Sequence, residues 1–238
     1  MNRPLLALAP LLLAFRPQEP KLPAPPDPLY ETRETHDING IGKFFMGREI
    51  AHVMGPGGIP WLERPEREDE ERPTKVIDAL ELKGGEVVCD FGAGSGYYTF
   101  RLAPRLPQGK VLAVEIQDEM IRELKKNAEA KKTTNVEILQ GTVKDPRLPE
   151  KGVDLLLMVD VYHELEFPYE TMLQVRKALK PGGRVVLVEF RKEDPKVPIK
   201  EVHKMSEAQI QKEMGLFGLS HVKTVGTLPW QHIAIYAK

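Results

Sequence analysis

A turn with three alternating glycines follows an apolar run that ends in an acid. The segment, residues 87–96, reads VVCDFGAGSG and contains Asp90, Gly92, Gly94 and Gly96. Glycines permit positive φ angles and let a ligand lie directly on the backbone. The start of the following helix adds free N–H groups and partial positive charge. Together with the acid, this predicts a site for a ligand of both charges, such as an amino acid, whereas a bare pyrophosphate would be repelled.

Acids also end two later apolar runs of the chain. Glu115 lies about 20 residues beyond the glycines, where nucleoside-binding folds place a carboxylate for the ribose hydroxyls. Asp160 follows the apolar run 154–159. Ligands of open α/β sheets bind at the carboxyl ends of the strands, so these acids are expected near the glycine turn. The alternative role of Glu115 is that of a surface acid capping the next helix.

Strand and helix patterns alternate from residue 76 onward. Strands are expected at residues 86–91, 109–116, 136–140, 153–159 and 184–190, with a turn at 180–183. Helices are expected at residues 76–82, 97–106, 117–131, 169–179 and 206–214. Segments 221–226 and 231–237 are expected to form a C-terminal antiparallel hairpin. The pattern predicts an α/β, Rossmann-like, doubly wound and mostly parallel seven-stranded sheet with helices on both faces.

The glycine turn resembles the first motif of the class I S-adenosylmethionine-dependent methyltransferases, D-x-G-x-G-x-G. The dinucleotide-binding motif, G-x-G-x-x-G, places its third glycine one residue later. The resemblance extends over residues 76–238 through five ordered motifs, and it is strongest to small-molecule enzymes related to the quinone-biosynthesis C-methyltransferases. It implies methyl transfer to an unidentified small-molecule acceptor, with S-adenosyl-L-methionine as the methyl-donor cosubstrate.

The resemblance also implies which residues contact each ligand. The cofactor-binding residues expected from it are Asp90, Gly92, Ala93, Gly94, Gly96, Glu115, Ile116, Thr142, Val143 and Asp160. Thr142 stands where many members carry an acid that binds adenine. The catalytic residues expected to orient or deprotonate the acceptor are Tyr162, His163 and Glu164. A bracing hydrogen bond is the alternative role for His163.

Other kinds of site have weaker signals. No metal site is expected, because His163, Glu164, His203 and His232 show no recognised ligand spacing. The single cysteine, Cys89, lies in an apolar strand and is interpreted as a core residue, which excludes thiol-based arsenic methylation. A non-catalytic S-adenosylmethionine- or nucleoside-binding module is one alternative function. A nicotinamide-dependent oxidoreductase is another, and the glycine spacing argues against it.

The first 75 residues precede the expected methyltransferase domain, residues 76–238. Residues 1–29 combine a signal-like apolar run, too short for a comfortable membrane span, with a proline-rich linker. A true secretory signal would indicate a periplasmic or exported protein, and its absence a cytoplasmic one. Residues 30–75 are expected to form an N-terminal helical cap with a short helix at 47–54.

The cap contains a charged run at residues 65–72, which is interpreted as a solvated helix. Arg48, Trp61 and Arg64 have a second possible role in covering the cofactor pocket. The net charge of −1, from 34 basic and 35 acidic residues, creates no global attraction to nucleic acid or anionic membranes. The expected partner is therefore a small-molecule acceptor. Neither binding to nucleic acid nor a stable membrane span is expected. No feature of the sequence indicates the oligomeric state. Acceptor specificity is expected to reside in the cap and in residues 228–232.

Overall fold

The computed structural model describes residues 21–238 of the chain. The apolar run near the N-terminus, and with it the expected signal segment, lies outside the described residues. Among the helices of residues 21–238, none has both the length and the apolar character that crossing a membrane requires.

A central sheet carries the parallel strands that the sequence predicts. These strands are β4 (Val87–Phe91), β5 (Lys110–Glu115), β6 (Val136–Gln140), β7 (Val153–Val159) and β8 (Leu179–Arg191). Two antiparallel strands, β10 (Ser220–Val225) and β11 (Gln231–Ala237), complete the order β10-β11-β8-β7-β4-β5-β6. The mostly parallel Rossmann-like α/β architecture is thereby confirmed.

Two details of the sheet differ from the prediction. A two-residue strand, β9 (Lys204–Met205), pairs with the end of β8, so the sheet has eight strands instead of seven. The expected turn at residues 180–183 lies within β8, because Leu179 already pairs with Val153 and the irregularity is absorbed as a register shift. Gly182 accommodates this shift with a φ of 74°.

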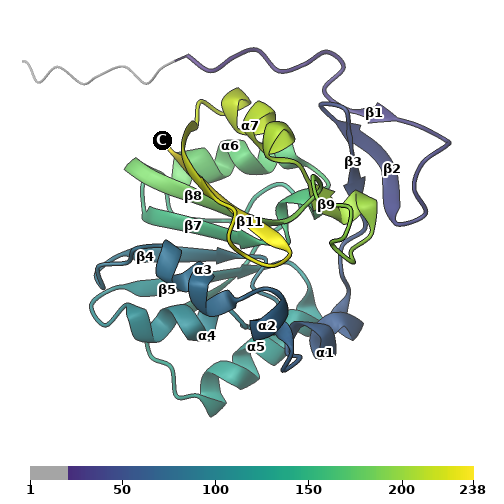
Figure 1. The fold of residues 1–238 in the computed structure, drawn as a ribbon. Coiled ribbons are helices and arrows are strands. Elements are labelled where there is room, and N and C mark those ends of the chain that lie inside the picture. Colours follow the sequence, from purple (N-terminus) through teal and green to yellow (C-terminus); the bar gives the residue numbers. More distant parts are fainter. Residues whose placement is uncertain (1–20) are drawn as a thin grey trace, which may run out of the picture.

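Helices cover both faces of the sheet, α6 and α7 above it and α3, α4 and α5 below it in the view of Figure 1. Their bounds are α3 (Pro73–Ala79), α4 (Thr99–Leu102), α5 (Asp118–Ala130), α6 (Pro168–Ala178) and α7 (Glu207–Leu216). Alternate residues of β7 enter opposite cores: Leu156 packs with α6 and α7, whereas Leu155 packs with α3 and α4. Burial on both faces explains the continuous apolar sequences of the parallel strands.

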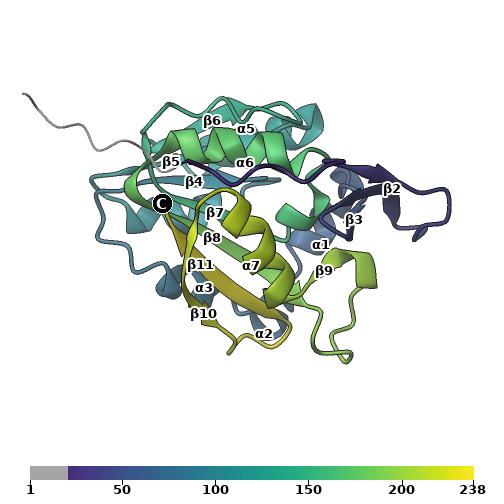
Figure 2. The ribbon, with the colours of Figure 1, turned by 90° about the horizontal axis from the view of Figure 1, so that it is seen from above.

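The expected short helix at residues 47–54 is wrong. Residues Arg48–Ala51 form strand β3, which pairs with β2 (Gly40–Phe45), and β2 pairs with β1 (Glu31–Thr32). Met46 and Gly47, with φ angles of 50° and 97°, form the tight connection between β2 and β3. Two consecutive positive φ angles match a hairpin turn and end any helical pattern. The N-terminal segment is therefore part sheet, and Figure 2 shows this small sheet projecting from one side of the molecule.

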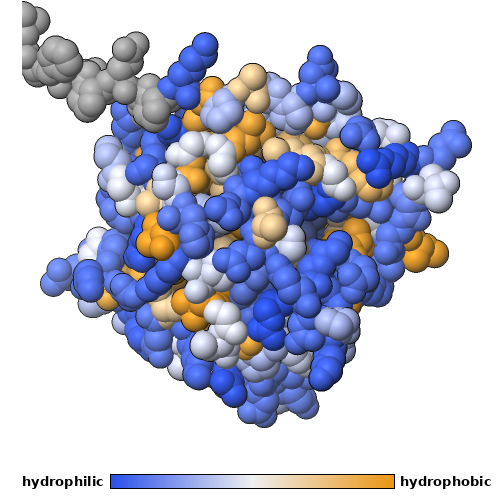
Figure 3. All heavy atoms as spheres, turned by 45° about the horizontal axis from the view of Figure 1, so that its top comes forward, coloured by the Kyte–Doolittle hydropathy of each residue, from blue (hydrophilic) through white to orange (hydrophobic). Residues whose placement is uncertain are grey.

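Short helical segments connect this small sheet to the central one. They are η1 (Pro56–Gly58), α1 (Ile59–Leu62) and α2 (Arg67–Glu70). Three further turns of 3₁₀ helix are η2 (Ala103–Arg105), η3 (Tyr162–Glu164) and η4 (Glu201–His203). The face of the molecule in Figure 3 is mostly hydrophilic, with separate apolar patches between the polar groups.

The charged run at residues 65–72 is not a solvated helix throughout. Arg67 and Glu71 are only 3% and 1% exposed, and they form an ion pair of 2.7 Å between Nε and Oε2. The Arg67 guanidinium lies 4.2 Å from the ring centre of Tyr97, directly after the glycine turn. A buried arginine needs a paired acid, and the i, i+4 spacing within the run supplies one. Segment α2 therefore packs onto the glycine turn.

Candidate active site

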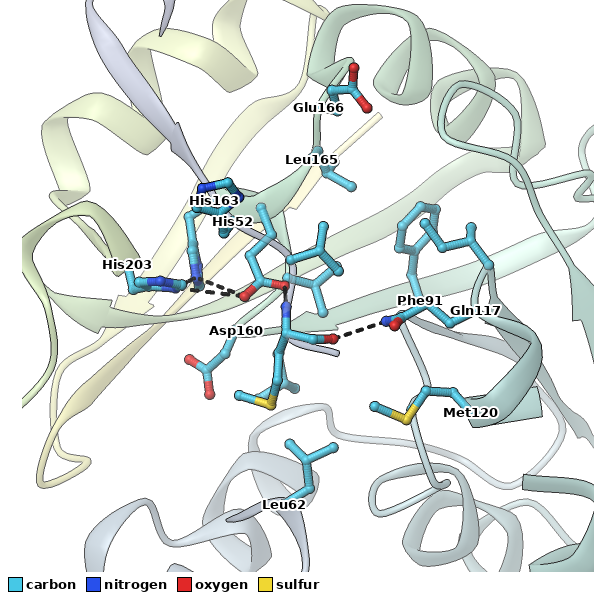
Figure 4. A pocket seen from close by; sticks show the side chains of 18 of the residues that line it. His52, Leu62, Phe91, Gln117, Met120, Asp160, His163, Leu165, Glu166 and His203 are labelled. Carbon is cyan, nitrogen blue, oxygen red and sulfur yellow. Dashed lines mark hydrogen bonds and ion pairs between the residues drawn. The ribbon is translucent and has the colours of Figure 1, made fainter. Parts of the chain in front are cut away.

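A cavity of about 580 Å³ opens at the carboxyl ends of β4, β5, β7 and β8 (Figure 4). Its size is that of an ordinary ligand pocket. Further walls come from the segments that flank the small N-terminal sheet, from α1, from the loop after β6, from η3 and from the loop before β9. The predicted site residues that line it are Gly92, Gly94, Glu115, Ile116, Thr142, Val143, Asp160, His163 and Glu164. The other predicted site residues, Asp90, Ala93, Gly96 and Tyr162, do not line it.

The glycine turn brings bare backbone to the cavity wall. Gly92, Gly94 and Gly96 have φ angles of 74°, 56° and 97°. A Cβ atom on Gly92 would lie 2.6 Å from Cγ2 of Val161, and one on Gly94 would lie 3.2 Å from Cδ1 of Leu62. Both the backbone angles and the lack of space require glycine at position 92. The third glycine instead packs inward, against Phe100.

Glu115 fastens the glycine turn to the end of β5. Its Oε2 accepts a hydrogen bond of 2.9 Å from the Gly94 N–H, and its Oε1 accepts bonds of 2.7 and 2.9 Å from the N–H groups of Ile116 and Gln117. A carboxylate has about four lone-pair sites, so one stays available for a ligand hydroxyl. Glu115 is therefore a fixed acceptor at the cavity wall and not a surface helix cap.

Thr142 shapes the loop that follows β6. Its Oγ1 accepts a hydrogen bond of 3.0 Å from the Asp145 N–H, and its own N–H donates to the Asp145 carbonyl at 2.8 Å. The neighbouring Val143 is 44% exposed and lines the cavity. This loop therefore presents an apolar surface beside Thr142, whose hydroxyl is occupied by its own turn.

Asp90 lies behind the turn, where it is 4% exposed. Its Oδ2 accepts a hydrogen bond of 2.5 Å from the Thr99 hydroxyl. It lines a second cavity of about 30 Å³ together with Ala93 and Arg67. Burial raises the pKa of Asp90 to about 6, although its hydrogen bonds with Thr99 act in the opposite direction.

The raised pKa of Asp90 predicts a pH-dependent effect of Asp90→Asn on stability. The native state holds this proton more tightly than the unfolded state, so stability is lost as pH rises from 3.8 towards about 6. Asparagine never ionises, and we expect the variant to be more stable than the parent by about 2–3 kcal/mol near neutral pH. Urea unfolding across this pH range measures the difference, which should vanish below about pH 4. A difference that does not change with pH would contradict this account of Asp90.

Asp160 ends β7 in a left-handed conformation, with a φ of 55°. Both of its carboxylate oxygens accept hydrogen bonds from Nε2 of Gln231, at 2.9 and 2.7 Å. Burial and the nearby carboxylates of Glu71 and Glu189 raise the pKa of Asp160 well above its usual range. The C-terminal hairpin thus positions this acid, a role for Gln231 that no sequence signal indicated.

Three ionisable side chains meet on one side of the cavity: His163, Glu164 and His203. Nε2 of His163 lies 3.1 Å from Nδ1 of His203, and Oε1 of Glu164 lies 3.8 and 3.6 Å from these two atoms. In Figure 4, His163, His203 and Asp160 lie close together, across the cavity from Phe91, Gln117 and Met120. His232, the fourth residue considered from the sequence as a metal ligand, is buried but does not belong to this group.

Buried charges tune this group of side chains. Burial opposes the charged form of His163, but the Glu189 carboxylate, 2.5 Å from its Nδ1, outweighs this and raises the pKa of His163. Burial together with His163 lowers the pKa of His203 to about 4. Burial raises the pKa of Glu164 to about 7, against the effect of His163. Glu189 lies at the end of β8, a strand end that sequence reasoning left unassigned.

A buried ion pair braces the turn η3 that carries His163. Nε of Arg48 lies 2.7 Å from Oε1 of Glu213, and Nη1 of Arg48 donates to the carbonyl of His163 at 3.2 Å. Tyr162 donates its hydroxyl proton to Oε2 of Glu213 at 2.7 Å and is fully buried. The geometry therefore gives Tyr162 and Arg48 positioning roles. The direct acceptor contact expected of Tyr162 does not fit its place in the fold.

Arg48→Met is expected to lower the free energy of unfolding by about 3–5 kcal/mol, because it leaves the Glu213 carboxylate buried without its cation. The double variant Arg48→Met/Glu213→Met removes both charges and should recover part of this loss. Urea denaturation of the parent and both variants measures these changes. A single variant as stable as the parent would show that the ion pair does not brace the fold.

Of the remaining cap candidates, Trp61 lines the cavity and is 39% exposed. The Arg64 guanidinium stacks on its ring at 3.5 Å. Arg67 also lines the cavity. The sequence did not indicate this position, because it depends on the tertiary contact between Arg67 and Tyr97. Trp61 therefore covers the pocket, which is the second role expected for it from the sequence. Arg64 supports the Trp61 ring from outside.

A known protein family matches most of the chain. A family model described as a methyltransferase domain matches residues 82–232 of the chain. The chain belongs to the class I S-adenosylmethionine-dependent methyltransferases. Its structure is similar to that of an S-adenosylmethionine-dependent methyltransferase from Aquifex aeolicus, with a TM-score of 0.73 and 25% identity, over 78% of this chain and 99% of that one. S-adenosylmethionine is the methyl donor in this family.

Curated methyltransferases named for different acceptors also match the chain. The malonyl-[acyl-carrier protein] O-methyltransferase of Halalkalibacterium halodurans is 24% identical over 67% of this methyltransferase chain and 52% of that protein. The tRNA U34 carboxymethyltransferase of Desulfotalea psychrophila is 36% identical over 54% of this chain and 43% of that protein. The chain thus spans about half the length of these relatives, which leaves its own acceptor to be argued from the site.

Proposed function

We propose that this methyltransferase transfers a methyl group to a small, largely apolar acceptor that enters the main cavity. The supporting observation is the distribution of exposed apolar side chains. Among residues 21–238, six large hydrophobic residues are exposed, and five of them line this one cavity. These five residues are Ile38, Val53, Trp61, Ile116 and Val143. Apolar surface gathered at a cavity is typical of ligand-binding sites.

The wall beside the glycine turn fits the methyl donor. S-adenosylmethionine supplies a methyl group on a positively charged sulfonium, which is a good leaving group. The free lone pair of Glu115 would accept a hydrogen bond from a ribose hydroxyl, and the bare backbone at Gly92 and Gly94 would bind the methionine end. Ile116 and Val143 would pack against the adenine. A direct contact of Asp90 with the methionine amino group stays a prediction, because Asp90 lines the smaller cavity and not the main one.

The other side of the cavity would bind the acceptor. His163 and Glu164 would orient its nucleophilic atom towards the methyl group and favour loss of its proton. Alignment and exclusion of water would be the main contributions of the protein to such a displacement. The likeness to quinone-biosynthesis C-methyltransferases remains a prediction about the acceptor, as does the division of the chain near residue 75.

The proposal is tested by incubating the purified chain with S-adenosylmethionine and a panel of acceptors, and by measuring S-adenosylhomocysteine. The panel contains quinols, phenols and apolar amines, with tRNA and a lysine-rich protein as macromolecular comparisons. Turnover with a small apolar acceptor is expected. Turnover confined to tRNA or protein would overturn the acceptor class. Tight cofactor binding without turnover on any member would favour the non-catalytic binding module.

A further inference from the structure

The group of His163, Glu164 and His203 has the chemistry of a metal-ligand set. One ligand atom from each of the three side chains lies within 4.8 Å of the others. The pairwise separations are 3.1, 3.6 and 3.8 Å. Ligand atoms bound tetrahedrally to zinc at 2.0–2.1 Å lie roughly 3.3 Å from one another. The three side chains therefore stand close to metal-binding geometry with only small movements required.

The surroundings of His163 favour one ring nitrogen as the ligand. Its Nδ1 contacts the buried carboxylate of Glu189, so its Nε2 faces Glu164 and His203. Metal-binding histidines almost always donate their other ring N–H to such a carboxylate or to a carbonyl. The same carboxylate accepts the Tyr162 N–H at 3.0 Å. The outer contacts that a metal-binding histidine needs are thus already in place.

Carboxylates outnumber the imidazoles around the group. Glu189 is fully buried and the side chain of Glu164 is 11% exposed. Within residues 21–238 their ion-pair partners are His163 and His203 alone, and Asp160 has none. Oε1 of Glu164 accepts no hydrogen bond from the described residues and faces only the two imidazoles. Buried carboxylates require a compensating cation or a bound proton. A bound divalent ion would supply such a cation.

We propose that Nε2 of His163, Nδ1 of His203 and a carboxylate oxygen of Glu164 bind a divalent transition-metal ion, for which Zn²⁺ is the best match. Two imidazoles and one carboxylate form a known zinc ligand set that leaves a coordination position open. All three side chains line the main cavity, so that position would face it. Local spacing rules did not indicate this site, because His203 comes from η4, 40 residues after His163.

The consequence for methyl transfer rests on the proposed function. An oxygen or nitrogen of the acceptor could occupy the open position, where the metal would lower its pKa and release its proton to water. The ion would then hold the nucleophile in its deprotonated form within the cavity. The acceptor would belong to the class of apolar molecules with a metal-binding hydroxyl or amine.

The experiment is a titration of the chelator-treated full chain with Zn²⁺ by calorimetry, and with Co²⁺ by visible absorption. We expect about one equivalent to bind and Co²⁺ to show the intense visible bands of a low-coordinate site. His203→Ala should weaken binding about 100-fold or more, and Glu189→Gln about 10- to 100-fold. His221→Ala, which removes an exposed histidine bonded to Thr224, serves as the matched control and should bind as the parent does.

The same samples are titrated with S-adenosylmethionine, which reports the integrity of the fold and of the cofactor site. Unchanged cofactor affinity in His203→Ala together with lost Zn²⁺ binding supports the metal site. Equal Zn²⁺ affinity in His203→Ala and the parent, or no saturable binding to the parent, overturns it. If cofactor binding persists in that case, the proposed methyl transfer stands without the metal.

Discussion

Glu115→Gln is expected to weaken the binding of S-adenosylmethionine about 10- to 100-fold. A hydrogen bond to a charged group contributes about 1.5–3 kcal/mol, and the ribose hydroxyl bonded to the free lone pair of Glu115 would lose it in the variant. The glutamine also has one acceptor oxygen in place of two, so it cannot serve the N–H groups of Gly94, Ile116 and Gln117 together. At least one of these bonds would be lost, whereas the N–H groups of Gly92 and Ala93 would stay bonded to the Val114 carbonyl of β5. Calorimetric titration with S-adenosylmethionine measures the effect.

The matched control for this variant is Glu137→Gln. Glu137 lies on the neighbouring strand β6, and its exposed ion pair with Lys110 lies away from the cavity. An exposed pair contributes about 0–1 kcal/mol, so cofactor affinity and stability should both stay near those of the parent. If Glu115→Gln bound the cofactor as tightly as this control, the proposed ribose contact would be wrong.

His163→Ala is expected to slow turnover about 100-fold or more while changing cofactor affinity little. The imidazole lies on the proposed acceptor side of the cavity, whereas Glu115 and the glycine turn lie on the proposed donor side. Its loss therefore removes orientation and proton transfer at the acceptor but no contact with the donor. Single-turnover measurements with saturating S-adenosylmethionine, beside calorimetry, separate the two effects.

The neighbour Glu189 provides a further comparison. Glu189→Gln keeps the side-chain shape but weakens its contact with Nδ1 of His163, so it should give an intermediate rate and a shifted pH profile. His221→Ala should leave turnover unchanged. Unaltered turnover in His163→Ala would instead place His163 among the bracing residues of η3, the alternative considered from the sequence.

The parallel sheet, the glycine turn and the position of Glu115 were predictable because their sequence signals are local. An apolar strand, a carboxylate at its tip and a glycine turn lie within ten residues of one another in the segment around Asp90. Glu115 follows at a spacing set by one helix and one strand. Parallel strands then bring such ends to one edge of the sheet. The family assignment followed from the same motifs and was confirmed.

The acceptor side was less predictable because long-range packing builds it. His203 meets His163 only after β8 and the following loop have returned to the cavity. Arg67 is buried because it packs on Tyr97, so its charged neighbours gave a misleading polar pattern. The β2–β3 connection depends on two positive φ angles at Met46 and Gly47, which a helical periodicity does not reveal. The errors at Arg67 and at residues 47–54 reflect tertiary packing and strand pairing overriding a local pattern.

The central claim is that the glycine turn after β4 and the Glu115 carboxylate bind the methyl donor. A crystal structure of the chain with S-adenosylhomocysteine tests it most directly. We predict a ribose hydroxyl within hydrogen-bond distance of Glu115 and the amino-acid end against the backbone of residues 92–96. Density for the nucleoside elsewhere, with Leu62 still packed on Gly94 and the turn closed, would contradict the account.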